Sequence, residues 1–192
     1  MGQILIMDNM ILDFIQKSMH SGFLDQVMPV ITALDNGGAI WIAVGIIFLL
    51  TRGYRRYGFA LLLALLVGTL VGSVVLKPLV ARVRPFEVNT AITLLIARPT
   101  DFSFPSGHAM SSFTAATVIL KAHKKLGIIA FIVALLIAFS RLYLYVHYPS
   151  DVLVGMIFGV VIGIIAIKVL QIQKKRREGR IIMGSRSNYT IR

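Results

Sequence analysis

Three short stretches of this chain carry the polar residue types that chemistry on a charged substrate requires. The first holds Lys77, Arg82 and Arg84, the second is Pro105–His108, and the third is Ser140–Asp151. Arginine offers a planar fork of donors to phosphate oxygens, whereas lysine offers a mobile point charge. If folding brings the three stretches together, they predict a site for a phosphate-bearing substrate.

The second stretch has the pattern of a helix start. Proline suits the first turn, Ser106 can cap the free N–H groups, and Gly107 permits a close backbone approach. The N–H groups at such a helix end can hold a phosphate. His108 could then donate a proton to a leaving oxygen if its pKa lies near neutrality. Taken alone, the same residues also fit an ordinary helix cap and a satisfied interior histidine.

The third stretch places His147 and Asp151 four residues apart, with Pro149 between them. If a helix begins at Pro149, Asp151 lies in its first turn and can reach back to the imidazole. A carboxylate on one ring nitrogen fixes the tautomer and leaves the other nitrogen free as a base or nucleophile. The alternative is a purely structural His–Asp hydrogen bond. We predict no metal and no other cofactor, because no third zinc ligand is obvious and the nearby cations oppose a metal.

The composition is that of a membrane protein. Of the 192 residues, 57% are apolar and 15% are charged, with a mean hydropathy of +0.82, whereas about a quarter of the residues of a soluble domain are charged. These values exclude a soluble enzyme and a disordered chain. The length suits one domain. We therefore predict a single membrane domain over residues 1–172, with an amphipathic N-terminal region, and a basic cytoplasmic tail over residues 173–192.

Apolar stretches predict an all-α, polytopic bundle of about six helices. The stretches long enough to cross a bilayer are Phe59–Leu76, Leu126–Val146 and Val152–Leu170. Two shorter stretches are Gly38–Leu50, which needs its flanks to span, and Ala109–Leu120, which predicts an interior helix begun near Pro105. The amphipathic stretch Met10–Leu34 predicts an interfacial helix followed by a short span. The count is thus five spans, with a sixth from the N-terminal region.

Clusters of lysine and arginine set the predicted topology. They lie at residues 52–56, 121–125 and 174–180, and alternation of the spans places all three on one side. Loops rich in lysine and arginine remain cytoplasmic, so the three polar stretches should meet on the extracytoplasmic side. The basic tail predicts a topology anchor that also touches anionic headgroups. We therefore expect the membrane as a partner and no nucleic acid.

Glycines recur every four residues in two of the predicted spans. They are Gly155, Gly159 and Gly163 in one span, and Gly68 and Gly72 in another. Such faces let helix backbones approach closely. Packing within the bundle is the default interpretation and a dimer interface is the alternative. The spacing does not separate the two, so the oligomeric state stays open.

A site with three cations, a helix N-terminus and two histidines suits phosphoryl transfer, where catalysis is mostly positioning and charge stabilisation. The three stretches also resemble the three signature motifs of the type 2 phosphatidic acid phosphatase (PAP2) superfamily. The matching segments are Lys77-PLVARV-Arg84-Pro85, Pro105–His108 and Ser140-Arg141-LYLYV-His147-YPS-Asp151. Every signature position matches, in order, and the resemblance runs from about Lys77 to Asp151. Small bacterial members of this family have a bundle of about six helices.

The resemblance implies a role for each matched residue. His147 would attack phosphorus and form a phosphohistidine intermediate, Asp151 would orient it, and His108 would protonate the leaving group. The residues implied to bind the phosphate and stabilise the transition state are Lys77, Arg84, Ser106, Gly107, Ser140 and Arg141. Family members need no metal. Arg82 lies outside the motif and is treated as auxiliary.

The resemblance also implies a substrate class. In small bacterial members the usual substrates are undecaprenyl pyrophosphate, phosphatidylglycerol phosphate and phosphatidic acid. The predicted topology favours the first, because undecaprenyl pyrophosphate is released on the outer face during wall synthesis. We therefore expect a multi-pass protein of the bacterial plasma membrane with an extracytoplasmic active site. The alternatives from other classes are a lipid phosphotransferase and a non-enzymatic membrane protein.

Overall fold

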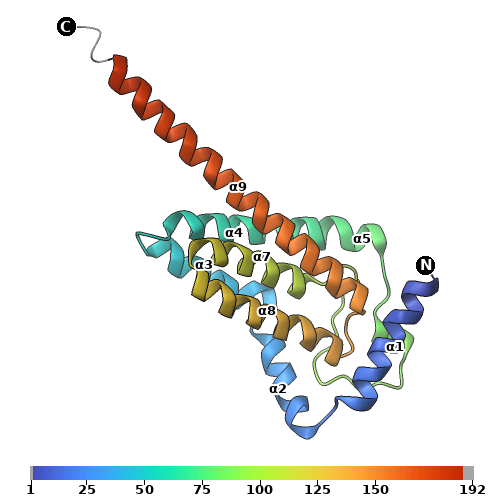
Figure 1. Cartoon of the computed structure of the whole chain (residues 1–192). Coiled ribbons are helices and arrows are strands. Elements are labelled where there is room, and N and C mark those ends of the chain that lie inside the picture. Colours follow the sequence, from blue (N-terminus) through green and yellow to red (C-terminus); the bar gives the residue numbers. More distant parts are fainter. Residues whose placement is uncertain (1, 188–192) are drawn as a thin grey trace.

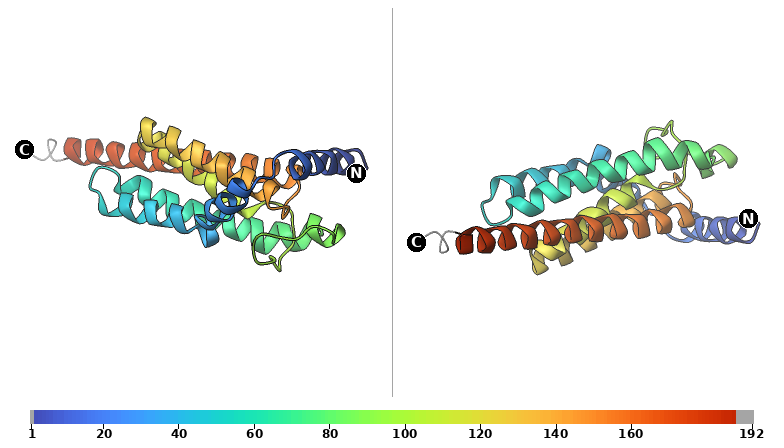
Figure 2. Two further views of the ribbon diagram at one scale, coloured as in Figure 1. Left: turned by 90° about the horizontal axis from the view of Figure 1, so that it is seen from below. Right: turned by 90° about the horizontal axis from the view of Figure 1, so that it is seen from above.

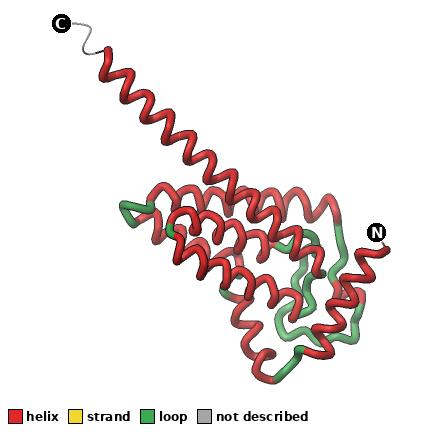
Figure 3. Tube along the Cα trace, viewed as in Figure 1, coloured by secondary structure: helices red, strands yellow, loops and turns green. Residues whose placement is uncertain are grey.

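The computed structural model describes residues 2–187, and the side chains of residues 2–173. The described residues form helices and loops without any strand, which confirms the predicted all-α class (Figure 3). In chain order the elements are α1 (Gly2–Ser18), α2 (Gly22–Ala33), the 3₁₀ turn η1 (Asn36–Gly38), α3 (Ala39–Leu50), α4 (Arg55–Thr69), the π-helical segment η2 (Leu70–Leu76), α5 (Lys77–Val80), α6 (Pro85–Val88), α7 (Gly107–Ala122), α8 (Lys124–Tyr143) and α9 (Pro149–Ser187).

Helix α7 is the centre of the bundle. It packs against α4, α8 and α9, while α3 packs on α4 (Figure 1). Ala109, Ala115 and Val118 on α7 are completely buried. This helix is therefore the interior helix that the polar stretch from Pro105 predicted, and Ser106 caps its first turn as expected.

Fewer helices are long and apolar enough to cross a membrane than the sequence predicted. Within the described residues, Arg55–Val88, Lys124–Tyr143 and Pro149–Gln173 are long and apolar enough to cross a membrane. A fourth span results if α2 and α3, which meet at a 43° bend, count as one. The predicted five or six included α7, but its 16 residues are fewer than the roughly 20 of a lipid-facing span. Neighbouring helices enclose this helix instead.

The two ends of the bundle differ in the loops that they carry. Figure 2 shows the α3–α4 turn and the far end of α9 at one end, and the loops around α5, α6 and the start of α9 at the other. The first end holds the lysine and arginine clusters, and the second holds the three polar stretches. Helix α9 continues to Ser187, so the predicted basic tail is largely a continuation of this helix. Residues 188–192 of that tail lie outside the described part.

The glycines of α9 face α7. A Cβ added at Gly155 would lie 2.6 Å from the Ser106 carbonyl oxygen, and one at Gly159 would lie 2.5 Å from the Met110 carbonyl oxygen. Real Cβ atoms do not approach backbone so closely, so any larger residue would push the two helices apart. The glycine repeat of α9 thus serves packing within the bundle, which was the default interpretation.

Gly159→Ala is expected to destabilise the fold by about 1–3 kcal/mol, because overpacking forces the α7 and α9 backbones apart. The midpoint of thermal unfolding in detergent should fall accordingly. Leu153→Ala is the matched control, since this side chain on the same helix is 57% exposed and faces away from the bundle. An unchanged midpoint for Gly159→Ala would contradict the close α7–α9 contact.

Candidate active site

Six of the nine residues assigned to the site by sequence line one cavity of about 560 Å³. They are Lys77, Arg84, Gly107, His108, Arg141 and His147. Lys77 begins α5, Arg84 immediately precedes α6, the Gly107–His108 pair begins α7, Arg141 lies in the last turn of α8, and His147 lies in the loop before α9. The three polar stretches therefore meet, although as many as 74 residues separate their members.

The other three predicted residues, Ser106, Ser140 and Asp151, lie behind the cavity lining and are fully buried. The Ser106 hydroxyl accepts the Ala109 N–H at 3.4 Å as the cap of α7. The Ser140 hydroxyl donates to the Ile137 carbonyl at 2.6 Å. Both hydroxyls are thus engaged within their own helices, and their contact with a phosphate stays a prediction.

His147 and Asp151 lie close together in the way that a helix start at Pro149 predicted. The imidazole Nδ1 lies 3.7 Å from Asp151 Oδ2, which is longer than a hydrogen bond. This nitrogen is buried and has no hydrogen-bond partner among the described residues. Catalytic hydrogen bonds are often long before substrate binds and shorten in the complex. A small movement would let Asp151 accept the Nδ1 proton.

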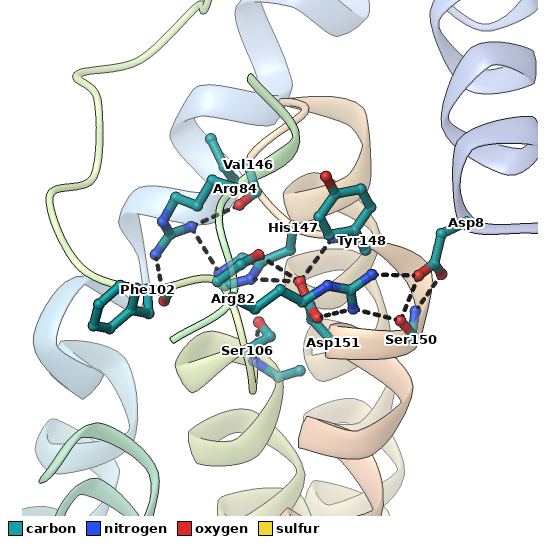
Figure 4. A network of polar contacts seen from close by, with 12 residues as sticks. Asp8, Arg82, Arg84, Phe102, Ser106, Val146, His147, Tyr148, Ser150 and Asp151 are labelled. Carbon is teal, nitrogen blue, oxygen red and sulfur yellow. Dashed lines mark hydrogen bonds and ion pairs between the residues drawn. The ribbon is translucent and has the colours of Figure 1, made fainter. Parts of the chain in front are cut away.

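Asp151 is held by donors that the sequence pattern did not reveal (Figure 4). Its Oδ2 accepts the Ser103 hydroxyl at 2.5 Å and the Tyr148 N–H at 3.0 Å. Its Oδ1 accepts a hydrogen bond from Arg82 Nη1 at 2.5 Å. Arg82, treated above as auxiliary, thus contacts the carboxylate that faces His147. Ser103 carried no signal in the sequence, because a lone serine in a loop has no diagnostic spacing.

Arg84 lies on the other side of the imidazole and is almost completely buried. Its guanidinium donates to the Val146 carbonyl at 2.6 Å and to the Asp101 carbonyl at 2.7 Å. These contacts leave Nη1 3.3 Å from His147 Nε2. A phosphate held by this fork would present its phosphorus to the Nε2 nitrogen.

The His147 imidazole is neutral in this environment. It lies in a loop outside the helices but is 1% exposed. Burial, and then the positive charges of the arginines and lysine around the cavity, holds the pKa of His147 well below its usual range. A neutral imidazole has a free lone pair, which a nucleophile needs.

Asp101 is a charged residue of the cavity that the sequence pattern missed. Its carboxylate accepts hydrogen bonds from the Lys77 ammonium and, at 2.6 Å, from Arg84 Nη2. Partial burial favours the neutral acid, but these two cations outweigh it and hold the pKa of Asp101 at about 2. At neutral pH the carboxylate is therefore ionised, and it occupies the two cations that were predicted to bind a phosphate. An arriving phosphate would compete with it.

Several buried polar atoms on the cavity lining have no partner among the described residues. They are Nε2 of His108, Nε of Arg141 and Oδ1 of Asp35. Arg141 Nη1 donates to the Thr32 hydroxyl at 2.5 Å, and Asp35 Oδ2 accepts the Ser111 hydroxyl at 2.5 Å. Unpaired buried polar groups are rare and costly. Their gathering at one cavity leaves these atoms able to bond to a polar ligand or to water within it.

The described residues contain no group of three or more His, Cys, Asp or Glu side chains placed to hold a metal. The cavity offers cations, the N-terminal end of α7 and a neutral imidazole. Cations aimed at a phosphate can stabilise the charge that develops during phosphoryl transfer. This set of groups suits nucleophilic attack on a phosphate monoester or pyrophosphate.

Comparisons with known proteins agree with this chemistry. A family model described as the PAP2 superfamily matches residues 53–175. An undecaprenyl-diphosphatase from Sulfolobus acidocaldarius is 34% identical over 68% of this chain, although the match spans only 63% of that relative's length. Phosphatidylglycerophosphatase B from Bacillus subtilis is 35% identical, with 73% of this chain and 72% of the relative covered.

A solved structure shows the same fold. The transmembrane PAP2-type phosphatidylglycerolphosphate phosphatase from Bacillus subtilis superimposes with a TM-score of 0.73 at 27% identity, covering 88% of this chain and 87% of that one. Together with the apolar helices, this similarity makes the chain a multi-pass membrane protein. The chain therefore belongs to the PAP2 superfamily, the family of the lipid phosphatases that it resembles.

Proposed function

We propose that this protein is a metal-independent membrane lipid phosphatase that acts on a phosphate or pyrophosphate monoester at the extracytoplasmic face. The substrate favoured here is undecaprenyl pyrophosphate, which would be converted to undecaprenyl phosphate. One observation carries the proposal: Lys77, Arg84, Arg141, His108 and His147 converge on a single cavity. The basic turns at the opposite end of the bundle support the extracytoplasmic placement, because such loops remain cytoplasmic.

The proposed reaction uses the two histidines that line the cavity. His147 Nε2 attacks phosphorus, the N–P bond forms, and the bond to the leaving oxygen breaks. His108 must be protonated to act as the acid. Burial, and then the positive charges of Arg141, Lys77 and Arg84, lowers its pKa to about 3 rather than near neutrality, whereas the negative charge of a bound phosphate would raise it again. In its protonated form, His108 donates its proton to that oxygen. Water then attacks the phosphohistidine, His108 accepts the proton of the water, and the N–P bond breaks. The three cations hold the phosphate oxygens throughout and offset the charge that develops on them.

The names of the relatives support two substrates. Undecaprenyl-diphosphatases occur among them in both Sulfolobus acidocaldarius and Bacillus subtilis, which favours the carrier lipid. Phosphatidylglycerophosphatase B and its solved structure favour phosphatidylglycerol phosphate as the alternative. Both substrates present a phosphate at the membrane surface, so the same cations and the same nucleophile serve either one.

The test is phosphate release by the purified protein in detergent with EDTA present. Undecaprenyl pyrophosphate, phosphatidylglycerol phosphate and phosphatidic acid are compared at equal concentration, with His147→Ala as the blank. We expect release to survive EDTA, because arginine and lysine supply the charge that a metal would otherwise supply. The highest kcat/KM should be for undecaprenyl pyrophosphate.

Three outcomes would overturn parts of this proposal. A loss of activity in EDTA that Zn²⁺ or Mg²⁺ restores would contradict the metal-independent mechanism. A preference for phosphatidylglycerol phosphate would assign the protein to phospholipid synthesis in place of carrier-lipid recycling. Transfer of the phosphoryl group to a second lipid, without free phosphate, would make the protein a phosphotransferase.

A further inference from the structure

The N-terminal helix α1 contains a buried carboxylate with no place in the family motifs. Of the residues of α1, only Asp8, Leu12 and Ile15 are buried. The Asp8 side chain is 4% exposed, whereas its neighbour Met7 is 63% exposed. Burying an ionised carboxylate is costly unless it is paired and hydrogen-bonded. The partners of Asp8 therefore explain why this helix lies where it does.

Those partners lie next to the catalytic residues, since Ser150 precedes Asp151 in the first turn of α9 and Arg82 lies between α5 and α6. Asp8 Oδ1 accepts the Ser150 backbone N–H at 2.9 Å, and Oδ2 accepts the Ser150 hydroxyl at 2.6 Å. This N–H lies in the first turn of α9, where backbone donors have no partner within the helix. Asp8 also accepts a hydrogen bond from Arg82 Nη2 at 2.7 Å. A residue of one helix thus caps another helix from outside.

Arg82 connects the two carboxylates. While one amino group of its guanidinium bonds to Asp8, the other donates to Asp151 Oδ1 at 2.5 Å and to the Ser150 hydroxyl at 2.7 Å. The guanidinium also lies 4.0 Å from the centre of the Tyr148 ring. Figure 4 shows the resulting row, which runs from Asp8 on α1 through Arg82 to Asp151.

Helix α1 is fixed at a second point as well. Gln16 Nε2 donates to the Tyr143 carbonyl at 3.0 Å, and the side chains of Leu12 and Ile15 join a buried cluster with Tyr143 and Tyr145. The part of the helix from Asp8 to Gln16 is therefore docked against the segment that leads to the catalytic loop. Its contact at Asp8 is held by packing as well as by charge.

We propose that Asp8 is a positioning residue for the active site. It shares the Arg82 guanidinium with Asp151, and so sets where the Asp151 carboxylate lies relative to the His147 imidazole. Without Asp8, the whole charge of Arg82 acts on Asp151 and draws this carboxylate away from Nδ1. The role rests on the phosphatase function proposed above, and it makes α1 part of the catalytic apparatus.

The test is Asp8→Asn, which keeps the size and most hydrogen bonds of the side chain but removes its charge. We expect kcat for undecaprenyl pyrophosphate, or for whichever lipid phosphate the wild type turns over fastest, to fall about tenfold. KM should stay within about twofold, because the phosphate-binding cations are untouched. Asp13→Asn is the matched control on the same helix, where a half-exposed carboxylate pairs only with Lys17.

A double-mutant cycle with Arg82→Gln separates positioning from simple loss of structure. If Asp8 acts through Arg82, Asp8→Asn should lower kcat by less than about twofold in the Arg82→Gln background. Thermal midpoints in detergent establish that each variant is folded. Equal kcat for Asp8→Asn and wild type would overturn the proposal, as would a full tenfold loss in both backgrounds. Absence of turnover by wild type would instead count against the proposed function itself.

Discussion

Replacing His147 with alanine should abolish phosphate release, with a loss of at least about 10³-fold in kcat, as expected for removal of a nucleophile. The His147 Nε2 lies 3.3 Å from Arg84 Nη1, where it could attack a phosphate that Arg84 holds. This is a hydrogen-bond contact between the imidazole and Arg84. Arg84 is also held by the Val146 and Asp101 carbonyls, so removal of the imidazole should leave the fold intact. Phosphate release and the thermal midpoint in detergent are measured side by side.

The matched control is His123→Asn at the opposite end of the bundle. His123 caps α8 by accepting the Leu126 N–H, and asparagine is a good replacement at such a position. This variant should keep wild-type activity. Pre-steady-state kinetics add a second readout, since a covalent intermediate predicts a burst of leaving-group release in the wild type. Phosphate release by His147→Ala near the wild-type rate would refute the nucleophile assignment.

The sequence was sufficient to predict the parts of the site that local chain chemistry determines. A proline followed by a capping serine predicts a helix start wherever it occurs, and α7 begins at Gly107 with Ser106 as its cap. Pro149 likewise begins α9, which brings Asp151 to the side of His147. Regular spacing of basic clusters between apolar stretches was enough to place the three motifs at one end of the bundle.

The residues that the sequence could not reveal depend on contacts between distant segments. Asp101 meets Lys77 and Arg84 only because the loop that follows α6 folds back over the cavity, and nothing in its spacing indicates this. Asp8 interrupts an apolar helix and would be unfavourable in lipid if it were exposed there. Its position is explained only by Arg82 and Ser150, which lie more than 70 residues away. Ion pairs between residues far apart in the chain leave no regular spacing in the sequence from which they could be predicted.

The predicted number of spans differs from the number of long apolar helices for a related reason. Hydropathy measures how a helix would behave in lipid, but α7 is surrounded by protein. Its threonines donate to helix carbonyls, as Thr114 does to Gly159 at 3.1 Å, whereas Ser112 donates to the Asp35 carboxylate at 3.3 Å. Such a helix need not be long or strongly apolar, because it contacts neighbouring helices in place of lipid. The same enclosure allows His108 to project from α7 into the cavity.

The second large effect is expected from Arg84→Lys, which keeps the charge but removes the planar fork. The guanidinium contacts the Val146 carbonyl, the Asp101 carbonyl and the Asp101 carboxylate at the same time. A lysine ammonium cannot reach these three acceptors and still lie beside His147 Nε2. We expect kcat to fall about 10²-fold, the loss typical of removing one preorganised donor from a transition state.

Arg98→Lys is the control for this variant, since Arg98 is exposed on the loop between α6 and α7 and its guanidinium lies 5.9 Å from the centre of the Phe86 ring. It should retain wild-type kcat. Arg84→Lys also leaves the buried Val146 carbonyl unpaired, so stability should fall by about 1–3 kcal/mol. Assays below the thermal midpoint separate this effect from catalysis. If kcat of Arg84→Lys stays within about threefold of wild type, positive charge alone suffices at this position, and the fixed geometry of the fork is not what stabilises the transition state.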